Sequence, residues 1–180
     1  MKLSILICTL PERSHYLQRL MGILQPQLTD EVEVLTDIRE RGISTGQKRN
    51  DLVGKAIGEW VVFIDDDDIV PDYYVREILK ASSANPDTIT FKGYMTTNGY
   101  NRKDFVLMLG EKYEERNGKY YRFPNHITPM RRSIAKMVQF PNITIGEDYA
   151  WAKQINDLRL LKTECHIDKD MYHYDYKTQK

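Results

Sequence analysis

The first half of the chain alternates strand-like apolar runs with amphipathic helical segments. Residues 2–8 form an almost uninterrupted apolar run, which is typical of a strand covered on both faces, as in parallel sheets. Apolar positions then recur at helical spacing from Leu17 to Leu24, and the Gln25-Pro26 step ends that segment. The same order follows again as a strand over 32–37, an amphipathic helix over 47–57 and a strand over 60–64. This β-α-β-α-β order predicts right-handed crossovers and an α/β fold with a mostly parallel central sheet flanked by helices.

The alternation of strands and helices ends in the second half of the chain. A helix from Pro71 to about Ser82 and a strand over 87–94 continue it. Asn117-Gly118 is a strong hairpin signal within a small region of antiparallel pieces, expected over 105–109, 113–115 and 119–123. Short helices are expected over 129–138 and 147–158, and closing strands or an extended tail over 160–167 and 171–176. Without a repeat or linker to divide it, the chain is expected to form a single domain over residues 1–180.

Composition and charge exclude several classes of protein. The chain has 180 residues, with 26 Lys+Arg balanced by 26 Asp+Glu, and this length supports a core without disulfides or a structural metal. The net charge of +0 argues against binding of nucleic acid through a global basic field. Cys8 and Cys165 are too few and too far apart for a disulfide framework, so we expect a reduced, cytoplasmic setting. No stretch approaches the apolar length that a transmembrane helix needs.

Four consecutive aspartates, Asp65 to Asp68, follow the third apolar strand. Ligands of open α/β sheets bind beyond the carboxyl ends of the strands, which is where this run lies. Because side chains alternate along an extended segment, Asp65 with Asp67, or Asp66 with Asp68, can present hard oxygen ligands to Mg²⁺ or Mn²⁺. Such a metal would offset the repulsion among four like charges and would clamp a diphosphate. The alternative interpretation is an Asx turn and a helix cap ahead of Pro71.

The segment from Gly58 to Asp68 resembles the segment that carries the DxD metal site of GT-A glycosyltransferases, above all the inverting, family-two-like enzymes. Further blocks resemble the same family in its order and spacing, namely Ser4 to Thr9, Val34 to Asp37, Lys48-Arg49-Asn50 and Gly146-Glu147-Asp148. The loop from Cys8 to Arg13 departs from the family, which commonly has Pro-Thr-Tyr-Asn there. The resemblance implies a single GT-A, Rossmann-like domain, with a nucleotide-binding part at about 1–94 and an acceptor-side part at about 95–180.

The resemblance also implies a role for each matching residue. Asp148 would be the general base that takes the proton of the acceptor hydroxyl. The donor nucleotide would be bound by Thr9, Asp37, Lys48, Arg49, Asp65 and Asp66. Mn²⁺ or Mg²⁺ would be bound by Asp67, with Asp68 and the late residue His173 as further candidate ligands. The register within the four aspartates stays open.

Several of these residues also have a purely structural interpretation. Lys48 and Arg49 can belong to a solvated helix face, and a lone histidine such as His173 is often a packing residue. An acidic residue in the first turn of a helix is favoured by the helix dipole alone. The same dipole favours the ionised carboxylate and so makes it a weaker base. A role for Asp148 as base therefore requires a compensating apolar wall, which Tyr149 or Trp151 can supply.

Together these roles imply a metal-dependent, inverting glycosyltransferase that moves a sugar from a nucleotide-sugar donor, above all a UDP-sugar, to an acceptor hydroxyl. A glycan, a lipid-linked intermediate, a protein or a modified DNA base is open as the acceptor. A sugar nucleotidyltransferase and a non-catalytic nucleotide-sugar binding module are the alternatives. The loop from Gly42 to Gly46 is not a P-loop, because no Ser or Thr follows Lys48, so kinase and ATPase interpretations lose support.

Overall fold

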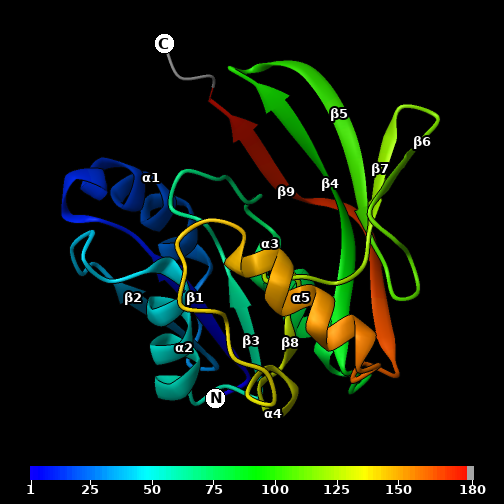
Figure 1. Ribbon diagram of the computed structural model, residues 1–180, viewed down its shortest axis with the longest axis horizontal. Coiled ribbons are helices and arrows are strands. Elements are labelled where there is room, and N and C mark those ends of the chain that lie inside the picture. Colours follow the sequence, from blue (N-terminus) through cyan, green and yellow to red (C-terminus); the bar gives the residue numbers. More distant parts are fainter. Residues whose placement is uncertain (178–180) are drawn as a thin grey trace.

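One mixed β-sheet runs through the computed structural model, which describes residues 1–177 (Figure 1). Its strand order is β2-β1-β3-β8-β4-β5-β7-β6, and β9 pairs with β4. The strands are β1 (Leu3–Cys8), β2 (Val32–Asp37), β3 (Trp60–Phe63), β4 (Thr88–Thr97), β5 (Tyr100–Leu107), β6 (Glu114–Arg116), β7 (Lys119–Arg122), β8 (Met130–Arg131) and β9 (Glu164–Tyr176). The helices are α1 (Ser14–Leu24), α2 (Thr45–Lys55), α3 (Tyr74–Ser82), α4 (Arg132–Ala135) and α5 (Glu147–Asp157), with short 3-10 turns at Pro11–Arg13 and Gln25–Gln27.

The first half of the chain forms the predicted β-α-β-α-β unit, with boundaries within a few residues of those expected. β1 pairs in parallel with both β2 and β3, so that Cys8 lies opposite Asp37 and Leu6 lies opposite Phe63. Parallel pairing brings the carboxyl ends of these three strands to one edge of the sheet. The four aspartates follow β3 at that edge.

The second half of the chain differs from its prediction in three places. β6 and β7 form the hairpin predicted from Asn117-Gly118, and both turn residues have positive φ, 52° and 73°. Because this hairpin reverses the chain and places β7 between β5 and β6, β7 runs parallel to β5, where an antiparallel pair was expected. The helix predicted over 129–138 is shortened to α4, because Met130 and Arg131 pair with neighbouring strands as β8. The two closing segments are one strand, β9.

Helices cover both faces of the sheet and bury an apolar cluster on each. On one face, α1 and α3 pack against β1 residues that include Leu3, Ile5 and Ile7. On the other face, α2 and α5 pack against residues that include Leu6 and Phe63. Burial on both faces explains the almost uninterrupted apolar run at the start of the sequence. Among residues 1–177, no helix is long and apolar enough to cross a membrane.

A close approach fixes the segment before α5 against the start of α2. Ser44 caps α2 by accepting a hydrogen bond from the backbone N–H of Gln47 at 3.1 Å. The backbone N–H of Gly46 donates to the carbonyl of Ile143 at 3.0 Å. A Cβ atom at Gly46 would lie 1.8 Å from the carbonyl oxygen of Pro141, so no side chain can be accommodated there.

Gly46→Ala should therefore lower the free energy of unfolding by about 1–3 kcal/mol, the usual range for overpacking. Gly54→Ala is the matched control, because it lies in the same helix and its added Cβ would meet nothing within 4 Å. That control should be neutral or stabilising by up to about 1 kcal/mol. Urea unfolding of the three proteins measures both effects, and equal midpoints for wild type and Gly46→Ala would contradict the close contact.

Candidate active site

Two adjoining cavities lie beyond the carboxyl ends of β1 and β3. The larger cavity has a volume of about 870 Å³, and its polar lining includes Thr9, Arg13, Lys48, Asp66 and Asp67. The smaller, called the aromatic cavity below, has a volume of about 340 Å³ and is lined by Asp148, His126 and a set of aromatic side chains, Phe105, Tyr113, Tyr149, Tyr172 and Tyr174. Asp65 and Tyr174 line both cavities. The residues at this edge thus form one continuous site.

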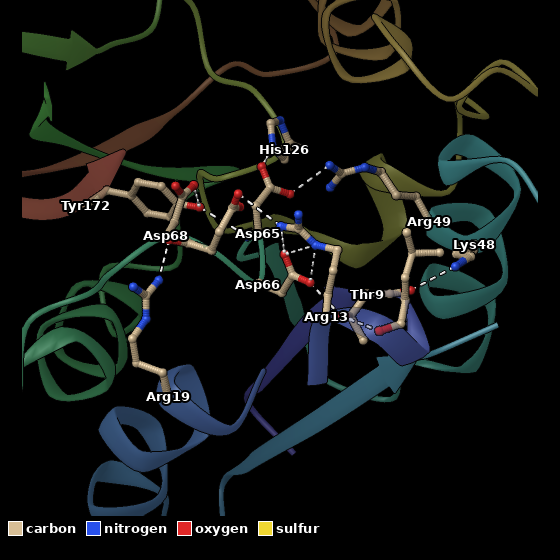
Figure 2. Close-up of polar contacts among 12 residues, drawn as sticks. Thr9, Arg13, Arg19, Lys48, Arg49, Asp65, Asp66, Asp68, His126 and Tyr172 are labelled. Carbon is tan, nitrogen blue, oxygen red and sulfur yellow. Dashed lines mark hydrogen bonds and ion pairs between the residues drawn. The ribbon is translucent and has the colours of Figure 1, made fainter. Parts of the chain in front are cut away.

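Asp65 joins distant parts of the chain where the two cavities meet. Its carboxylate accepts a hydrogen bond from Arg49 Nη2 at 2.9 Å and lies 3.3 Å from His126 Nε2 (Figure 2). Burial would raise the pKa of Asp65, but the charge of Arg49 and the hydrogen bonds from Arg49 and His126 outweigh it and hold that pKa well below its usual range. Asp65 is therefore ionised, and its carboxylate has a fixed orientation at the boundary between the cavities.

Arg13 pairs with the next two aspartates. Its Nε lies 2.9 Å and its Nη2 2.5 Å from the carboxylate oxygens of Asp66, and Thr9 Oγ1 donates to the same carboxylate at 2.5 Å (Figure 2). Arg13 Nη2 also lies 2.9 Å from Asp67. Asp66 is buried, whereas the side chain of Asp67 stays 34% exposed and lines the larger cavity. Asp67 is therefore the member of this pair that a ligand can reach.

Asp68 is buried on the side of the aromatic cavity. It accepts a hydrogen bond from the Tyr172 hydroxyl at 2.7 Å, and that hydroxyl accepts one from the backbone N–H of Asp65 at 3.1 Å. Burial and the charge of Asp65 raise the pKa of Asp68 well above its usual range, although the tyrosine hydrogen bond opposes the shift. Asp68 lines the aromatic cavity and not the larger cavity, so the structure does not bring it to the larger cavity beside Asp67.

The expected alternation of side chains along the aspartate run was wrong. β3 ends at Phe63, and residues 65–68 form a turn in which the backbone N–H of Asp68 donates to the carbonyl of Asp65 at 3.1 Å. Side chains in a turn do not follow the two-residue period of a strand. As a result Asp66 and Asp67, which are neighbours in sequence, share Arg13.

Lys48 brings a buried ammonium group to the larger cavity. Its Nζ donates to the backbone carbonyl of Thr9 at 2.8 Å and to that of Arg39. Both of these partners are neutral, so the positive charge remains able to attract an anion that enters the cavity. Asp37 lines neither cavity, because both of its carboxylate oxygens accept hydrogen bonds from Arg39 Nε at 2.9–3.0 Å.

Arg49 is buried beneath the site, where it pairs with two carboxylates. The side chain is 5% exposed, and its Nε donates to Glu147 at 3.1 Å while its Nη2 binds Asp65 at 2.9 Å. Its guanidinium lies 4.8 Å from the centre of the Phe63 ring. Arg49 thus ties α2 to the end of β3 and to the start of α5, and it lines neither cavity.

Asp148 lies in the first turn of α5 and lines the aromatic cavity. Its side chain is 38% exposed, and one carboxylate oxygen lies 3.5 Å from His126 Nδ1. Tyr149 lines the same cavity and meets Tyr113 edge to face, with ring centres 5.1 Å apart. The expected apolar wall is therefore Tyr149 rather than Trp151, which is buried in the core.

His173 lies away from the four aspartates. Along β9, Tyr172 and Tyr174 line the aromatic cavity, whereas the ring of His173 stacks on Tyr94 at 4.4 Å. Its Nε2 lies 2.8 Å from Thr96 Oγ1. The structure therefore does not bring this candidate metal ligand to Asp67.

The family of the chain follows from its sequence. The family model described as "Glycosyl transferase family 2" matches residues 4–145, which is most of the chain. The chain belongs to glycosyl transferase family 2. This confirms the resemblance found in the aspartate run and the blocks around it. The matched region ends just before Gly146-Glu147-Asp148, so the candidate base lies outside it.

Solved structures of S. aureus TarS share the fold of this family 2 domain. The crystal structure of TarS matches with a TM-score of 0.72 at 17% identity, covering 97% of this chain and 37% of that one. TarS 1–349 in complex with UDP-GlcNAc matches with a TM-score of 0.72 at 16% identity, covering 100% and 59%. The complex with UDP gives 0.73 at 18% identity, covering 99% and 61%. At these identities the likeness establishes the fold alone, and it confirms the predicted GT-A class.

The chain spans less than two thirds of the length of each of these TarS structures. No curated protein sequence matches the chain. The family and the fold are therefore established, while the role of each side chain depends on the geometry of this site.

Sequence reasoning missed Arg13, His126 and Tyr172 in the family 2 site. Four consecutive like charges require a compensating cation. We assigned that role to a metal and did not consider Arg13, which lies in the loop after β1. His126 looks like a loop residue in the sequence, and Tyr172 like part of an aromatic tail. Their roles depend on β9 and on the segment before β8 folding back over the aspartates, which no local pattern reveals.

The carboxylates of the larger cavity suit a divalent cation that is bound partly by the protein and partly by a substrate. Within residues 1–177, no three His, Cys, Asp or Glu side chains cluster as a ready-made metal site. Mg²⁺ is usually bound through one or two carboxylates together with substrate phosphates and waters. Asp67, exposed in the larger cavity, fits that arrangement, whereas Asp66 is taken up by Arg13 and Thr9.

Proposed function

We propose that this family 2 domain transfers a sugar from a nucleotide-sugar donor to an acceptor hydroxyl, with inversion at the anomeric carbon. The observation that carries this proposal is the shared boundary at Asp65, where a cavity with cationic side chains meets a cavity that contains an exposed carboxylate. A donor in the first and an acceptor in the second would meet at that boundary. TarS 1–349 has been solved in complex with UDP-GlcNAc and with UDP, which supports a UDP-sugar as the first donor to test.

The larger cavity would take the donor. Lys48 and Arg13 would attract the diphosphate, and their donors suit phosphate oxygens. Asp65 would accept a hydrogen bond from a ribose hydroxyl, since Arg49 holds its carboxylate ionised and fixed. The volume of about 870 Å³ lies within the range of about 300–1,000 Å³ that is usual for ligand pockets.

Asp67 would hold Mn²⁺ or Mg²⁺ together with the diphosphate of the donor. A bound divalent metal supplies neutralisation of the negative charge that grows on the leaving diphosphate. Arg13 lies 2.9 Å from Asp67, so the guanidinium would share this carboxylate with the metal or turn toward the phosphates.

The aromatic cavity would take the acceptor. Asp148 would accept the proton of the attacking hydroxyl, and Tyr149 and Tyr113 would exclude water from one side of that contact. A single in-line displacement then forms the new glycosidic bond as the bond to the diphosphate breaks. The aromatic lining suits a sugar ring, so a glycan or lipid-linked sugar is the acceptor class to test first.

Asp67→Asn should raise the KM for the donor about 10–100-fold in the presence of Mn²⁺ and should weaken the dependence of turnover on the metal. The amide keeps the shape of the side chain but removes the negative charge that binds the cation. Asp72→Asn, at an exposed aspartate nearby in the chain, is the matched control and should behave as wild type. A metal titration with the same midpoint in wild type and Asp67→Asn would contradict the assignment.

A panel of nucleotide-sugars tests the proposed function. The purified protein is incubated with each donor and Mn²⁺ or Mg²⁺, with water as the default acceptor, and release of the nucleotide is measured. We expect release from at least one donor, with UDP-sugars first. Absence of both binding and release for every donor would contradict the proposal, and binding without release would favour a non-catalytic nucleotide-sugar module.

A further inference from the structure

His126 occupies a position between two carboxylates that the roles above leave unexplained. Its side chain is 7% exposed, with Nε2 at 3.3 Å from Asp65 and Nδ1 at 3.5 Å from Asp148. Figure 2 shows the ring beside one carboxylate oxygen of Asp65, while Arg49 binds the other oxygen. The backbone carbonyl of His126 accepts a hydrogen bond from the N–H of Phe63 at 2.9 Å. This contact fixes the backbone of residue 126 against the end of β3.

The two nitrogens of His126 face unequal partners. A neutral imidazole carries one N–H and one lone pair, whereas an ionised carboxylate can only accept. One oxygen of Asp65 pairs with the Arg49 guanidinium at 2.9 Å, so the other oxygen accepts the Nε2–H, and Nδ1 then presents its lone pair to Asp148. Nδ1 is buried and has no hydrogen-bond partner among residues 1–177. A buried nitrogen without a partner is destabilising, and this one faces the carboxylate that would receive a proton in the reaction.

We propose that His126 takes up the acceptor's proton from Asp148 and holds it between Asp148 and Asp65 until the products leave. This inference rests on the proposed function, in which Asp148 is the base. His126 does not touch the reacting atoms and acts through Asp148, so it is a positioning residue. The 3.5 Å contact would shorten when the acceptor binds, as hydrogen bonds in active sites commonly do.

The proton transfers balance without any further reactant. The O–H bond of the acceptor breaks as its oxygen bonds to the anomeric carbon, and the proton passes to a carboxylate oxygen of Asp148. The electron pair of the broken glycosyl–phosphate bond leaves with the nucleoside diphosphate. The O–H bond on Asp148 then breaks as an N–H bond forms at His126 Nδ1. Solvent removes this proton after release of the products, which restores the neutral ring.

The groups that face the two ring nitrogens are carboxylates, which accept hydrogen bonds. Asp65 and Asp148 face its two nitrogens, and Arg49 and Glu147 pair with each other behind Asp65. The other titratable side chains of the aromatic cavity are Asp68, Tyr113, Arg122, Tyr149, Tyr172 and Tyr174. A ring that carries the proton has an N–H for each of the two carboxylates, which the neutral ring lacks.

Two variants of His126 test the inference, measured with the nucleotide-sugar that wild type hydrolyses fastest, beginning with UDP-GlcNAc. His126→Gln keeps an amide N–H for Asp65 but has no basic nitrogen. We expect it to lower turnover about 10–100-fold while the affinity for UDP and Mn²⁺ stays within about twofold. His126→Ala leaves a ring-sized space. Added imidazole should restore its turnover at least about tenfold, whereas pyrazole, a ring of the same size and much weaker basicity, should not.

His166→Gln is the matched control, because His166 lies on β9, its Nδ1 contacts Thr90 at 3.0 Å, and it lines neither cavity. It should keep wild-type turnover.

Wild-type turnover in His126→Gln would overturn the inference. So would equal effects of imidazole and pyrazole on His126→Ala, which would assign the ring a packing role. If His126→Ala does not fold, His126→Gln decides alone: loss of turnover with UDP affinity retained supports the inference, and loss of both overturns it. Failure of the proposed function is distinguishable, because wild type would then release no nucleotide or Asp148→Asn would work at the full rate.

Discussion

Asp148→Asn should lower the rate of sugar transfer about 10²–10⁴-fold, the range over which general acid-base catalysis contributes. The substitution is nearly isosteric and keeps a polar group in the aromatic cavity, but an amide cannot accept a proton at neutral pH. Because Asp148 lines the aromatic cavity and not the larger one, donor binding should change little. The loss should therefore fall on turnover, with the KM for the donor within about threefold of wild type.

Steady-state nucleotide release and calorimetric binding of UDP with Mn²⁺ separate these two effects. The matched control is Asp157→Asn at the other end of the same helix, where the exposed carboxylate pairs with Lys153 at 2.5 Å. This variant should transfer at the wild-type rate. Undiminished turnover in Asp148→Asn would show that Asp148 is not the base that accepts the proton of the hydroxyl.

Arg49→Met should lower the free energy of unfolding by about 3–5 kcal/mol, as expected when one partner of a buried ion pair is removed. The side chain of Arg49 is 5% exposed, and so is that of Glu147, which would be left as an uncompensated buried charge. Asp65 would also lose the cation that fixes the orientation of its carboxylate. Methionine keeps much of the side-chain volume, so the effect isolates the loss of charge from the loss of packing.

Urea unfolding followed by fluorescence measures this loss. Arg76→Met is the matched control, because Arg76 is 75% exposed and its pair with Glu77 spans 3.6 Å, a surface contact expected to contribute little. A double variant with Arg49→Met and Glu147→Gln should recover part of the lost stability, since the stranded carboxylate is then removed. An unfolding midpoint for Arg49→Met equal to that of wild type would contradict the network.

The arrangement of the first half of the fold could be predicted because each element is decided locally. The apolar run over 2–8 and the helical spacing from Leu17 to Leu24 each report burial of one segment, and their order alone implies parallel pairing. The direction of β7 could not be predicted in this way. Parallel and antiparallel strands have the same two-residue period, so the choice of β5 as a neighbour is made by tertiary packing.

The location of the site could be predicted, but the partners within it could not. The carboxyl end of β3 places the aspartate run at the ligand-binding edge, as the sequence indicated. The partner of each aspartate comes from another element: Arg49 from α2, Arg13 from the loop after β1 and Tyr172 from β9. These pairings depend on how distant segments pack, and for the same reason His173 was placed with the metal although its ring lies on Tyr94.

In the proposed reaction, a nucleotide-sugar is cleaved between its sugar and its diphosphate at the boundary formed by Asp65. Phosphorus NMR of the reaction with the preferred donor and Mn²⁺ tests this most directly, because it identifies the bond that breaks. We expect an intact nucleoside diphosphate as the product from wild type and a strongly diminished signal from Asp148→Asn. Release of pyrophosphate, the product of a nucleotidyltransferase, or a donor left unchanged by wild type would contradict it.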